Sequence, residues 1–526
     1  MSALLSTADH SVSPPRIHIP RNYNAAVDLV ERNLLAGRAR KLAYIDDAGS
    51  YTFGELAARV NQAANALRAL GLGQEDRVMV ALLDTIDFPT VFLGAIKAGI
   101  VPIATNTLLT TSDYRFMLND SRAKVLIASA TLYARFEPAI ADAPHLRHVI
   151  VSGDSAPSQT NLKTLMDKTS IEASPAPTTN DEPCFWIYSS GSTGVPKGTV
   201  HPHSSLIYTA ELYARPILKL SEHDIVFSAA KLFFAYGLGN SLSFPLAVGA
   251  TAILMAERPT PDAVFKRLTE LKPSVFYGVP TLYAAMLAST DAPTQALALR
   301  VCTSAGEALP ADVGRRFTAR YGVDILDGIG STEMLHIFLS NRLGEVRYGT
   351  TGKPVPGYQL RLCADNGDEV GADELGELQI NGPTAALMYW NNRAQSRDTF
   401  VGPWTRAGDK YTRDAAGYYT YGGRTDDMLK VSGQYVSPFE VEAALMTHPA
   451  VLEAAVVGRQ DEDGLTKPQA VVVLNEGETP DPETEFALKA HVKALLAPHK
   501  YPRWIIFTQE LPKTATGKIQ RFKLRG

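Results

Sequence analysis

Strand-like apolar segments alternate with helix-like segments along much of this chain, and this alternation limits its fold more than any other feature. Residues 53–68 carry apolar side chains at helical spacing, an apolar run follows at 78–83, and a second helix is predicted at 87–98. Further apolar runs predict strands at residues 125–128, 149–151, 225–228, 252–255 and 275–277. Strands that alternate with helices favour mostly parallel sheets covered by helices on both faces. The sequence therefore predicts an α/β fold.

The segment Tyr188–Gly198 has the composition of a loop that holds phosphate. Its glycines let backbone N–H groups turn toward an anion, and its hydroxyls and one lysine, Lys197, add further donors. The apolar run 184–188 predicts a buried strand that leads into this loop. Its order differs from the common nucleotide-binding loop, because Pro196 precedes the lysine and Gly198 follows it. A flexible surface linker is the alternative interpretation, and the preceding strand and the single lysine argue against it.

Composition excludes several classes of protein. A chain of 526 residues is too long for one ordinary domain, and 45% apolar with 20% charged residues is typical of a globular protein. The formal net charge of −4 gives no electrostatic reason to expect nucleic acid or an anionic membrane as a partner. Charged residues and a proline interrupt the apolar region 78–104, so no membrane span is predicted. The amino terminus lacks a signal-peptide pattern, and we expect a cytoplasmic protein.

The cysteines and paired histidines do not predict a metal centre. Cys184, Cys302 and Cys363 are odd in number and far apart, which fits neither a disulfide framework nor a metal site. His201 and His203 form a His-Pro-His step, but no further ligand lies nearby at the spacing that zinc needs.

A domain boundary is predicted near residues 422–427, which divides the chain into a large domain at 1–425 and a small one at 426–526. Beyond it, Ser437, a following proline and Glu440 form a predicted capping box at a helix start. Strands at 451–457 and 468–474 and a helix at 483–496 complete a compact α+β unit. In the large domain, residues 152–182 are rich in Ser, Thr and Pro and predict a long surface connection.

Several separated segments carry residues that could belong to one site. Residues 304–310 follow a predicted strand with small side chains, and residues 328–333 join two glycines and two hydroxyls to Glu333. A carboxylate beside phosphate-binding hydroxyls suits Mg²⁺, although Glu333 alone could be an ordinary glutamate at a helix start. Asp409 could bind ribose hydroxyls or cap a turn. Lys518 ends a second Gly/Thr-rich turn at 512–518 and could equally be a solvated surface lysine.

In this order, these segments resemble the superfamily of acyl- and aryl-CoA synthetases, luciferases and peptide-synthetase adenylation domains, over residues 51–518. The resemblance implies a large N-terminal domain of parallel and mixed sheets with a distorted barrel-like part, and a small mobile C-terminal domain. It implies that a carboxylate attacks ATP to give an acyl adenylate and pyrophosphate, and that CoA then displaces AMP. ATP, Mg²⁺ and CoA are therefore expected to bind.

The resemblance also implies residue roles. The phosphate loop, which comprises Ser189, Ser190, Gly191, Ser192, Thr193, Gly194 and Lys197, would hold the β- and γ-phosphates. Thr332 would contact the α-phosphate and Glu333 would bind magnesium. The adenine site would include Ser304, Ala305, Gly306, Glu307, Asp327, Gly328 and Ile329, and Asp409 with Arg424 would hold the ribose. Lys518 would catalyse adenylation. Asp426 would be the hinge about which Lys430, Ser432 and Gly433 approach for thioester formation. Many relatives have an aromatic residue where this chain has Ile329.

The acyl pocket is expected between the segment 231–237 and the Glu333 motif. Its predicted lining is Phe234, Ala235, Tyr236, Ile329, Gly330, His336 and Ile337. Bulky walls suit a compact ring and exclude a long alkyl chain. The strings 233–240, 328–336 and 388–392 look most like those of benzoate–CoA ligases of bacterial aromatic degradation, which implies a small aromatic carboxylate as substrate.

Alternative substrates are 2-aminobenzoate, 4-hydroxybenzoate and a short or branched aliphatic acid, and His336 could bond a ring substituent or only shape the wall. A peptide-synthetase adenylation domain is less favoured, because no carboxylate near the pocket would bind an amino-acid ammonium. An alternative from another class is a catalytically silent nucleotide-binding regulator. A silent relative would be free to lose its catalytic residues, whereas this chain keeps all four of them: Lys197, Glu333, Asp409 and Lys518. A homodimer is left open.

Overall fold

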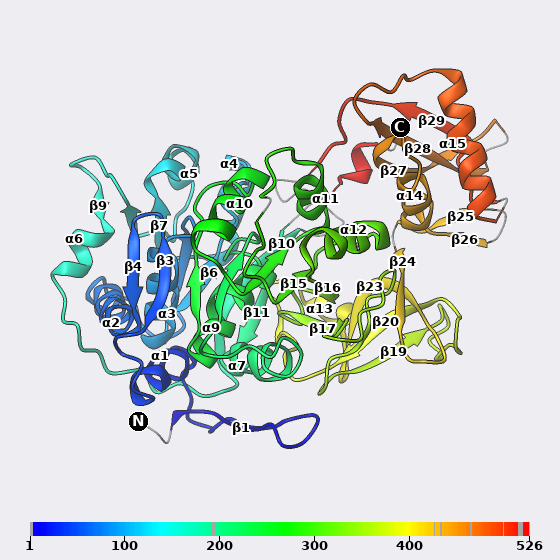
Figure 1. The fold of residues 1–526 in the computed structure, drawn as a ribbon. Helices are drawn as coiled ribbons and strands as arrows, with labels where there is room; N and C mark the ends of the chain where they lie inside the picture. Colours follow the sequence, from blue (N-terminus) through cyan, green and yellow to red (C-terminus); the bar gives the residue numbers. More distant parts are fainter. Residues whose placement is uncertain are drawn as a thin grey trace.

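A computed structural model describes residues 4–190, 196–293, 295–425, 427–431, 434–462, 465–497, 499–513 and 519–524, with the backbone alone at residues 190, 430, 434, 435 and 522. Two large sheets with helices between and outside them form the body, and a smaller unit follows it (Figure 1). The short strands β1 (Thr7–Asp9) and β2 (Arg16–His18) form a hairpin ahead of the body.

The first large sheet has eight strands and carries the predicted phosphate loop. In spatial order they are β21 (Met388–Tyr389), β11 (Pro196–Pro202), β10 (Pro183–Ser190), β6 (Val101–Ala104), β5 (Arg77–Ala81), β7 (Val125–Ser129), β8 (His148–Ser152) and β9 (Thr160–Asn161). From β10 to β9 the pairing is parallel, whereas β10, β11 and β21 pair antiparallel. The predicted buried strand before the loop is confirmed as β10.

The second large sheet has nine strands. They are β18 (Lys353–Pro354), β17 (Ile337–Ser340), β16 (Ile325–Gly330), β15 (Val301–Ser304), β14 (Val275–Gly278), β12 (Ile225–Ser228), β13 (Thr251–Ile253), β3 (Leu42–Asp46) and β4 (Gly49–Thr52). The six strands from β16 to β3 run parallel, and the edges are antiparallel. The parallel strands are those that the alternation of strands and helices predicts, and the antiparallel edges give the mixed sheet that the family resemblance implies.

Helices fill three layers around the two sheets. Between the sheets lie α1 (Ala25–Leu35), α2 (Phe53–Ala69), α3 (Asp87–Lys97), α7 (Ser204–Thr209), α8 (Ala235–Leu238) and α9 (Phe244–Val248), with the π-helical turns η3 (Ala210–Ala214) and η4 (Gly239–Ser243). Outside the first sheet, α4 (Thr111–Ser121), the turn η2 (Ala130–Leu132) and α5 (Tyr133–Ile140) pack on it. Outside the second sheet lie α10 (Pro261–Glu270), α11 (Pro280–Ala288) and α12 (Ala311–Tyr321). Helices cover both faces of the central strands, and this burial is the reason that their sequences are almost continuously apolar.

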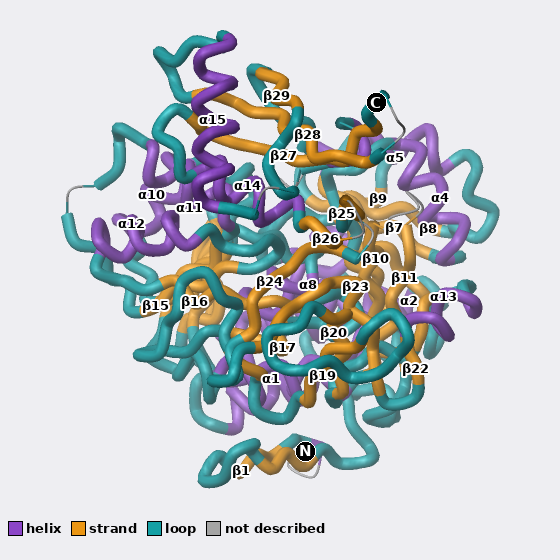
Figure 2. Tube along the Cα trace, turned by 90° about the vertical axis from the view of Figure 1, so that its right-hand side faces the viewer, coloured by secondary structure: helices purple, strands orange, loops and turns teal. Residues whose placement is uncertain are grey.

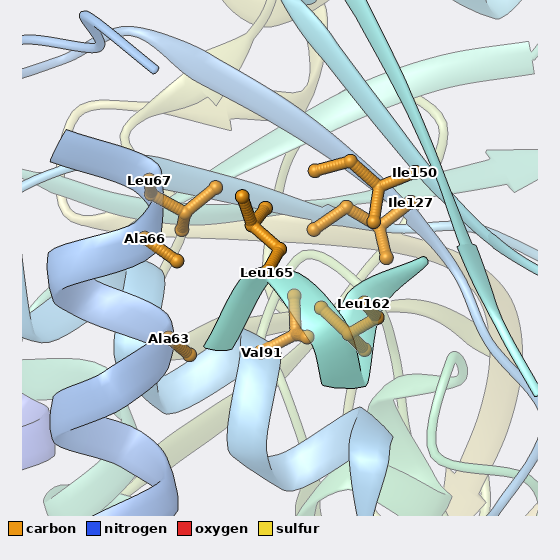
Figure 3. A pocket seen from close by; sticks show the side chains of 8 residues that line it. All are labelled: Ala63, Ala66, Leu67, Val91, Ile127, Ile150, Leu162 and Leu165. Atoms are coloured by element: carbon orange, nitrogen blue, oxygen red, sulfur yellow. The ribbon is translucent and has the colours of Figure 1, made fainter. Parts of the chain in front are cut away.

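The predicted surface connection at 152–182 is partly wrong, because it contains β9 and the helix α6 (Leu162–Asp167). Leu162 and its neighbour Leu165 pack toward α2 and α3 and help to line a small apolar cavity (Figure 3). The lining is Ala63, Ala66, Leu67, Val91, Ile127, Ile150, Leu162 and Leu165. With no polar side chain among these, the cavity has nothing to hold a water molecule or a polar ligand, and it is a gap in packing.

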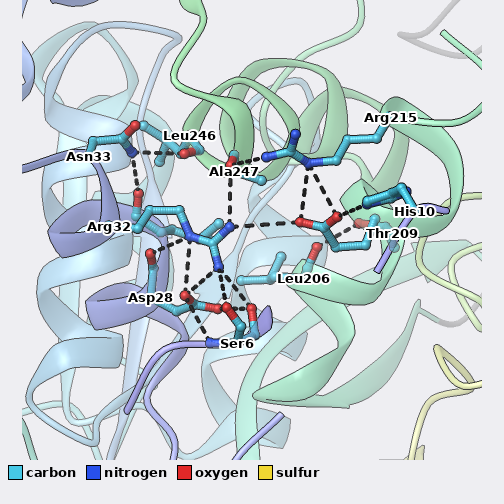
Figure 4. Close-up of polar contacts among 12 residues, drawn as sticks. Ser6, His10, Asp28, Arg32, Asn33, Leu206, Thr209, Arg215, Leu246 and Ala247 are labelled. Atoms are coloured by element: carbon cyan, nitrogen blue, oxygen red, sulfur yellow. Dashed lines mark hydrogen bonds and ion pairs between the residues drawn. The ribbon is translucent and has the colours of Figure 1, made fainter. Parts of the chain in front are cut away.

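The chain before α1 is fixed to the body by buried charges (Figure 4). Asp28 is fully buried, and it accepts hydrogen bonds from Ser6 Oγ (2.6 Å) and Arg32 Nη2 (2.5 Å). Arg32 lies 3.7 Å from a second buried carboxylate, Glu211 of η3, which also lies 2.6 Å from His10 Nε2. Each buried carboxylate therefore has charged or polar partners, as burial requires.

A five-stranded antiparallel sheet follows the two large ones: β19 (Gln359–Cys363), β20 (Gly376–Asn381), β22 (Phe400–Val401), β23 (Trp404–Arg413) and β24 (Tyr419–Arg424). The helix α13 (Arg393–Thr399) connects β21 to it. The barrel-like part that the resemblance implies stays a prediction for this region.

The C-terminal unit, orange to red in Figure 1 and seen from the side in Figure 2, has hydrophobic cores of its own. It contains β25 (Leu429–Val431), β26 (Gln434–Val436), α14 (Pro438–Met446), β27 (Val451–Gln460), β28 (Thr466–Leu474), α15 (Pro482–Leu495), β29 (Trp504–Phe507) and η5 (Arg521–Lys523). The predicted capping box is half right. Ser437 Oγ accepts from the Glu440 N–H at 3.1 Å, but both oxygens of the Glu440 carboxylate bond Lys500 (2.7 Å). The domain boundary at 425/426 stays a prediction.

Two properties of the described residues bear on the requirements of a membrane span and of a disulfide. No helix in the described ranges is long and apolar enough to cross a bilayer. Cys184, Cys302 and Cys363 are all buried and unpaired with one another.

Candidate active site

The hairpin of β10 and β11 presents the start and the end of the predicted phosphate loop side by side. Ser189 pairs with Lys197 across the hairpin, and Ser189 Oγ is buried without a hydrogen-bond partner in the described part of the chain. Burial lowers the pKa of the half-buried Lys197 ammonium; the charge of Glu333 opposes this, and that of Arg424 adds to it. Gly191, Ser192, Thr193 and Gly194 lie outside the described residues, as does the side chain of Ser190.

One face of this hairpin gathers polar side chains. Residues opposite one another in an antiparallel pair point to the same face, and side chains alternate along each strand. The pairs Ser189–Lys197 and Thr199–Tyr389 therefore share a face with His201. Lys197 Nζ lies 4.8 Å from the centre of the Tyr389 ring, as expected for this register.

The turn that carries Thr332 and Glu333 packs against this polar face. The Tyr389 hydroxyl donates to Glu333 Oε1 at 2.6 Å, and His201 Nε2 lies 2.8 Å from the Thr332 carbonyl oxygen. Burial, with Glu333 adding to it, raises the pKa of Tyr389, so its hydroxyl stays a donor. Burial lowers the pKa of His201 to about 4, so its neutral ring donates through Nε2. The structure thus brings Lys197, Thr332 and Glu333 together.

Backbone geometry in the turn separates Glu333 from His336. Leu335 has φ = 66°, a left-handed conformation that is costly for a branched side chain. Gly330 lies against the His336 backbone, since a Cβ there would come within 2.5 Å of the His336 carbonyl oxygen. As a result of this turn, Glu333 contacts Tyr389 of β21. His336, three residues later, contacts Asn240 of η4 and Tyr236 of α8 instead.

Two buried polar atoms lie at the carboxyl ends of neighbouring parallel strands. Ser304 of β15 pairs with Asp327 of β16, and neither Ser304 Oγ nor Asp327 Oδ1 has a hydrogen-bond partner among the described residues. Burial raises the pKa of Asp327 well above its ordinary value, although the N–H groups of Leu309 and Gly328 oppose this. Ligands of α/β sheets bind at this end of the strands. Around this place lie the rest of the predicted adenine site, Ala305, Gly306 and Glu307 after β15, and Gly328 and Ile329 at the end of β16.

The predicted ribose residues also meet. Asp409 of β23 pairs with Arg424 of β24, and Arg424 Nη1 lies 3.4 Å from Asp409 Oδ1 and 3.2 Å from the Ala407 carbonyl oxygen. Gly408 has φ = 70°, and a Cβ there would come within 2.9 Å of Arg424 Nη2. A glycine is therefore required for the guanidinium to lie along this strand.

Tyr236 and His336 form a linked pair in the predicted acyl wall. The Tyr236 hydroxyl lies 2.5 Å from Thr303 Oγ1. His336 Nε2 lies 3.2 Å from both the Tyr236 carbonyl oxygen and Asn240 Oδ1, two acceptors that require Nε2 to carry the proton. Burial lowers the pKa of His336 to about 3, so the ring is neutral. The other predicted residues lie beside the pair or on its strands: Phe234 and Ala235 precede Tyr236, and Ile329, Gly330 and Ile337 belong to β16 and β17.

Comparisons with known proteins identify the family of this chain. Residues 31–390 match the AMP-binding enzyme family and residues 440–518 match the AMP-binding enzyme C-terminal domain. The chain belongs to the AMP-binding enzyme family. It is 65% identical to a benzoate–CoA ligase of Thauera aromatica, over 99% of both chains. It is 52% identical to a 4-hydroxybenzoate–CoA/benzoate–CoA ligase of Rhodopseudomonas palustris, over 96% of this chain and 94% of that one. A crystal structure of a benzoate CoA ligase from Burkholderia xenovorans LB400 superposes with a TM-score of 0.90, at 56% identity over 96% of this chain and 100% of that one.

The family match confirms the predicted resemblance and the predicted fold class. Some predicted site residues, however, have no described geometry. Lys518, Asp426, Ser432 and Gly433 lie outside the described residues. Lys430 is described only as backbone in β25. Their roles stay predictions.

Four residues of the site were not predicted from sequence: Tyr389, His201, Thr303 and Asn240. Tyr389 and Asn240 lie in strings that carry the family resemblance, but no local pattern gives either a role, and the His-Pro-His step of His201 suggests only a zinc ligand, which its surroundings do not support. Each acts through a hydrogen bond to a residue that is distant in sequence, a relation that no local pattern reveals.

Proposed function

We propose that this protein is an ATP-dependent aryl-CoA ligase that activates benzoate to the acyl adenylate and transfers it to CoA, giving benzoyl-CoA, AMP and pyrophosphate. One observation carries the proposal: His336, a neutral ring bonded to the Tyr236 carbonyl oxygen, is three residues from Glu333, whose partner Tyr389 also contacts Lys197. A carboxylate bound between His336 and Lys197 would meet the phosphates of ATP. The 65% identity to a benzoate–CoA ligase over nearly all of both chains supports it.

ATP would bind across the described polar groups. The phosphate loop, with Lys197, would hold the β- and γ-phosphates, and Thr332 would contact the α-phosphate. Ser304 Oγ and Asp327 Oδ1, which have no hydrogen-bond partner among the described residues, support an adenine site, because a purine offers both donors and acceptors to them. Asp409 and Arg424 would hold the ribose.

A magnesium ion fits the residues present. In the described part of the chain, no three His, Cys, Asp or Glu side chains lie close enough to form a metal site by themselves. Mg²⁺ in phosphate-transferring sites takes one or two carboxylates and completes its shell with phosphate oxygens and water. Tyr389 bonds one oxygen of Glu333, so the carboxylate is oriented and its other oxygen is left for the ion. When bound, the ion would neutralise charge on the phosphates.

The neutral wall favours benzoate over acids that carry a second charge or a long alkyl chain. An uncharged ring placed on Tyr236 and His336 leaves no buried charge without a partner, and the bulky walls exclude long chains. 4-Hydroxybenzoate is the second candidate, because the Rhodopseudomonas palustris relative acts on both acids. 2-Aminobenzoate and short aliphatic acids stay further alternatives, as does the silent nucleotide-binding regulator.

The two half-reactions would divide between two positions of the small domain. We place the hinge at Asp426, the adenylation lysine at Lys518, and Lys430, Ser432 and Gly433 in the thioester step, as the family resemblance implies. The substrates ATP, CoA and benzoate fit the predicted cytoplasmic location, and the predicted homodimer stays open.

The experiment that tests the proposal is ATP- and CoA-dependent AMP formation with benzoate, 2-aminobenzoate, 4-hydroxybenzoate, cyclohexanecarboxylate, acetate and hexanoate. We expect a maximum at benzoate and a sharp loss for bulky para groups. A maximum at an aliphatic acid would overturn the assignment of the aromatic wall. Binding of ATP without pyrophosphate release for any acid would favour the silent regulator.

A further inference from the structure

We propose that Tyr389 is a positioning residue that holds Glu333 and Lys197 in place, and apart from one another, for a metal–ATP complex. The proposal rests on the ATP and magnesium roles proposed above and assigns a function to the two-residue strand β21. Tyr389 does not touch the reacting atoms in this arrangement. It acts through the two charged residues that do.

Tyr389 uses its two chemical sides for opposite charges. Its side chain is 3% exposed, its hydroxyl donates to Glu333 Oε1 at 2.6 Å, and the Lys197 ammonium lies 4.8 Å from its ring centre. A hydroxyl hydrogen suits a carboxylate, and the electron-rich face of the ring suits a cation. A phenylalanine could hold only the lysine, and an aliphatic residue could hold neither.

The ring keeps the two charges from neutralising one another. Among the described residues, no ion pair within 4.0 Å joins Lys197 to Glu333, although Tyr389 contacts both. In that same part of the chain, neither the Lys197 ammonium nor Glu333 Oε2 has a hydrogen-bond partner, so both stay available. A direct pair would place the lysine on the carboxylate that the metal needs. The spacing therefore leaves a cation for phosphate and a carboxylate oxygen for Mg²⁺.

The strand that carries Tyr389 is rigid enough for this purpose. Tyr389 pairs with Thr199 of β11, and its N–H donates to Ser396 Oγ at 3.0 Å. The next residue, Trp390, donates its N–H to the Gly198 carbonyl oxygen (2.7 Å) and packs on Trp186 with ring centres 4.6 Å apart. A positioning side chain is effective only when its own support is fixed in this way.

The test measures nucleotide and metal binding without turnover. The α,β-methylene analogue of ATP is titrated into the full-length protein by calorimetry over a series of Mg²⁺ concentrations, with no carboxylate present. For Tyr389→Phe we expect the Mg²⁺ concentration that gives half-maximal tightening to rise roughly 10- to 150-fold, the effect of one hydrogen bond to a charged group. Affinity at saturating Mg²⁺ should stay within about 3-fold of the parent, because the ring over Lys197 is kept.

Tyr114→Phe is the matched control. Tyr114 is also fully buried, and its hydroxyl donates to the Asn106 carbonyl oxygen at 3.0 Å, in the core on the other face of the first sheet. We expect it to leave the Mg²⁺ dependence unchanged. If Tyr389→Phe also leaves it unchanged, or if it lowers the thermal midpoint much more than Tyr114→Phe does, the hydroxyl is structural and the proposal fails.

A double-mutant cycle separates action through Glu333 from any other route. In a Glu333→Gln background, Tyr389→Phe should have no further effect on the Mg²⁺ dependence, because the carboxylate that it positions is gone. A full effect in that background would overturn the proposal. Manganese binding, followed by electron paramagnetic resonance with the same analogue present, should weaken in Tyr389→Phe by the same factor. Failure of the parent protein to bind the analogue at all would instead count against the proposed function.

Discussion

At the scale of single residues, the acyl wall depends on one short hydrogen bond. The Tyr236 hydroxyl lies 2.5 Å from Thr303 Oγ1, and Thr303 is fully buried at the end of a parallel strand. Thr303→Val keeps the shape of the side chain but removes the hydroxyl, so the partly buried phenol of Tyr236 loses its partner at a cost of about 1–3 kcal/mol. We expect the KM for benzoate to rise about tenfold and the KM for ATP to stay unchanged, as steady-state kinetics would measure. Thr303→Ser should behave like the parent; equal losses in both variants would mean that the hydroxyl does not hold Tyr236.

Sequence was informative at this scale where residue type alone limits the chemistry. A lysine inside a Gly/Ser/Thr loop suits an anion, a glutamate after a glycine-rich strand suits a cation, and the structure places Lys197 and Glu333 against the same tyrosine. Tyr389 could not be found in this way. A tyrosine is common in strands, and its partner Glu333 lies 56 positions away along the chain.

At the scale of elements, the packing of α2 on α3 depends on a glycine. A Cβ on Gly94 would lie 2.6 Å from Ala63 Cβ and 3.0 Å from the Val60 carbonyl oxygen. In an exposed helix, Gly→Ala stabilises the fold by about 1 kcal/mol. Only the close packing of α2 on α3 can make the same substitution destabilising at Gly94. We expect Gly94→Ala to lower the free energy of unfolding by about 1–3 kcal/mol in urea titrations. Adding Ala63→Gly should recover part of the loss, and a stabilised Gly94→Ala would show that the two helices can move apart.

Elements with strong local signals were predicted well, and short ones were not. The helix predicted at 53–68 is observed as α2, where Thr52 and Glu55 form a full capping box. In α14 the same kind of signal is only half realised, because the tertiary partner Lys500 takes the Glu440 carboxylate. The helix α6 has six residues and β21 has two, too few to display a period. Their existence depends on what they pack against.

At the scale of the whole molecule, buried neutral histidines should make the fold sensitive to acid. Burial lowers the pKa of His201 to about 4 and those of His203 and His336 to about 3. The unfolded chain, with ordinary values near 6.5, then binds more protons, so stability falls as the pH falls below about 6.5. Asp84 and Asp327 act in the opposite sense, since burial raises the pKa of Asp84 to about 6 and that of Asp327 well above its ordinary value, but two carboxyls are outweighed by three imidazoles.

We expect the urea midpoint to fall between pH 6.5 and 5, with each histidine contributing up to ~1.4 kcal/mol per pH unit and the two carboxyls offsetting part of this fall. His203→Asn is the test variant, because its amide oxygen can replace Nδ1 as the acceptor for the Ala25 N–H. The slope of stability against pH should be shallower in this variant. A slope equal to that of the parent would mean that His203 does not titrate during acid unfolding.

The proposed division of the two half-reactions between two positions of the small domain leads to a prediction for Lys518. A lysine beside the transferring phosphoryl group contributes preorganised charge to adenylation alone, and such donors are typically worth about 3–4 kcal/mol. Lys518→Ala should therefore lose adenylate formation by about 10²- to 10³-fold, yet convert supplied benzoyl adenylate to the thioester. Pyrophosphate release and thioester formation, assayed separately, distinguish these steps. Equal loss of both would refute a role confined to the first.

The buried charges around Arg32 have a practical consequence for handling the protein. Ser6 and His10 are partners of the carboxylates of Asp28 and Glu211, which lie inside the body. A purification tag joined ahead of Ser6 adds chain outside this network and leaves each carboxylate with its neighbours. Trimming the chain past His10, as is often done to promote crystal growth, would instead strip both carboxylates of a partner. For anyone designing an expression clone, the segment from Ser6 to His10 should therefore be kept, because it supplies partners to carboxylates of the folded core.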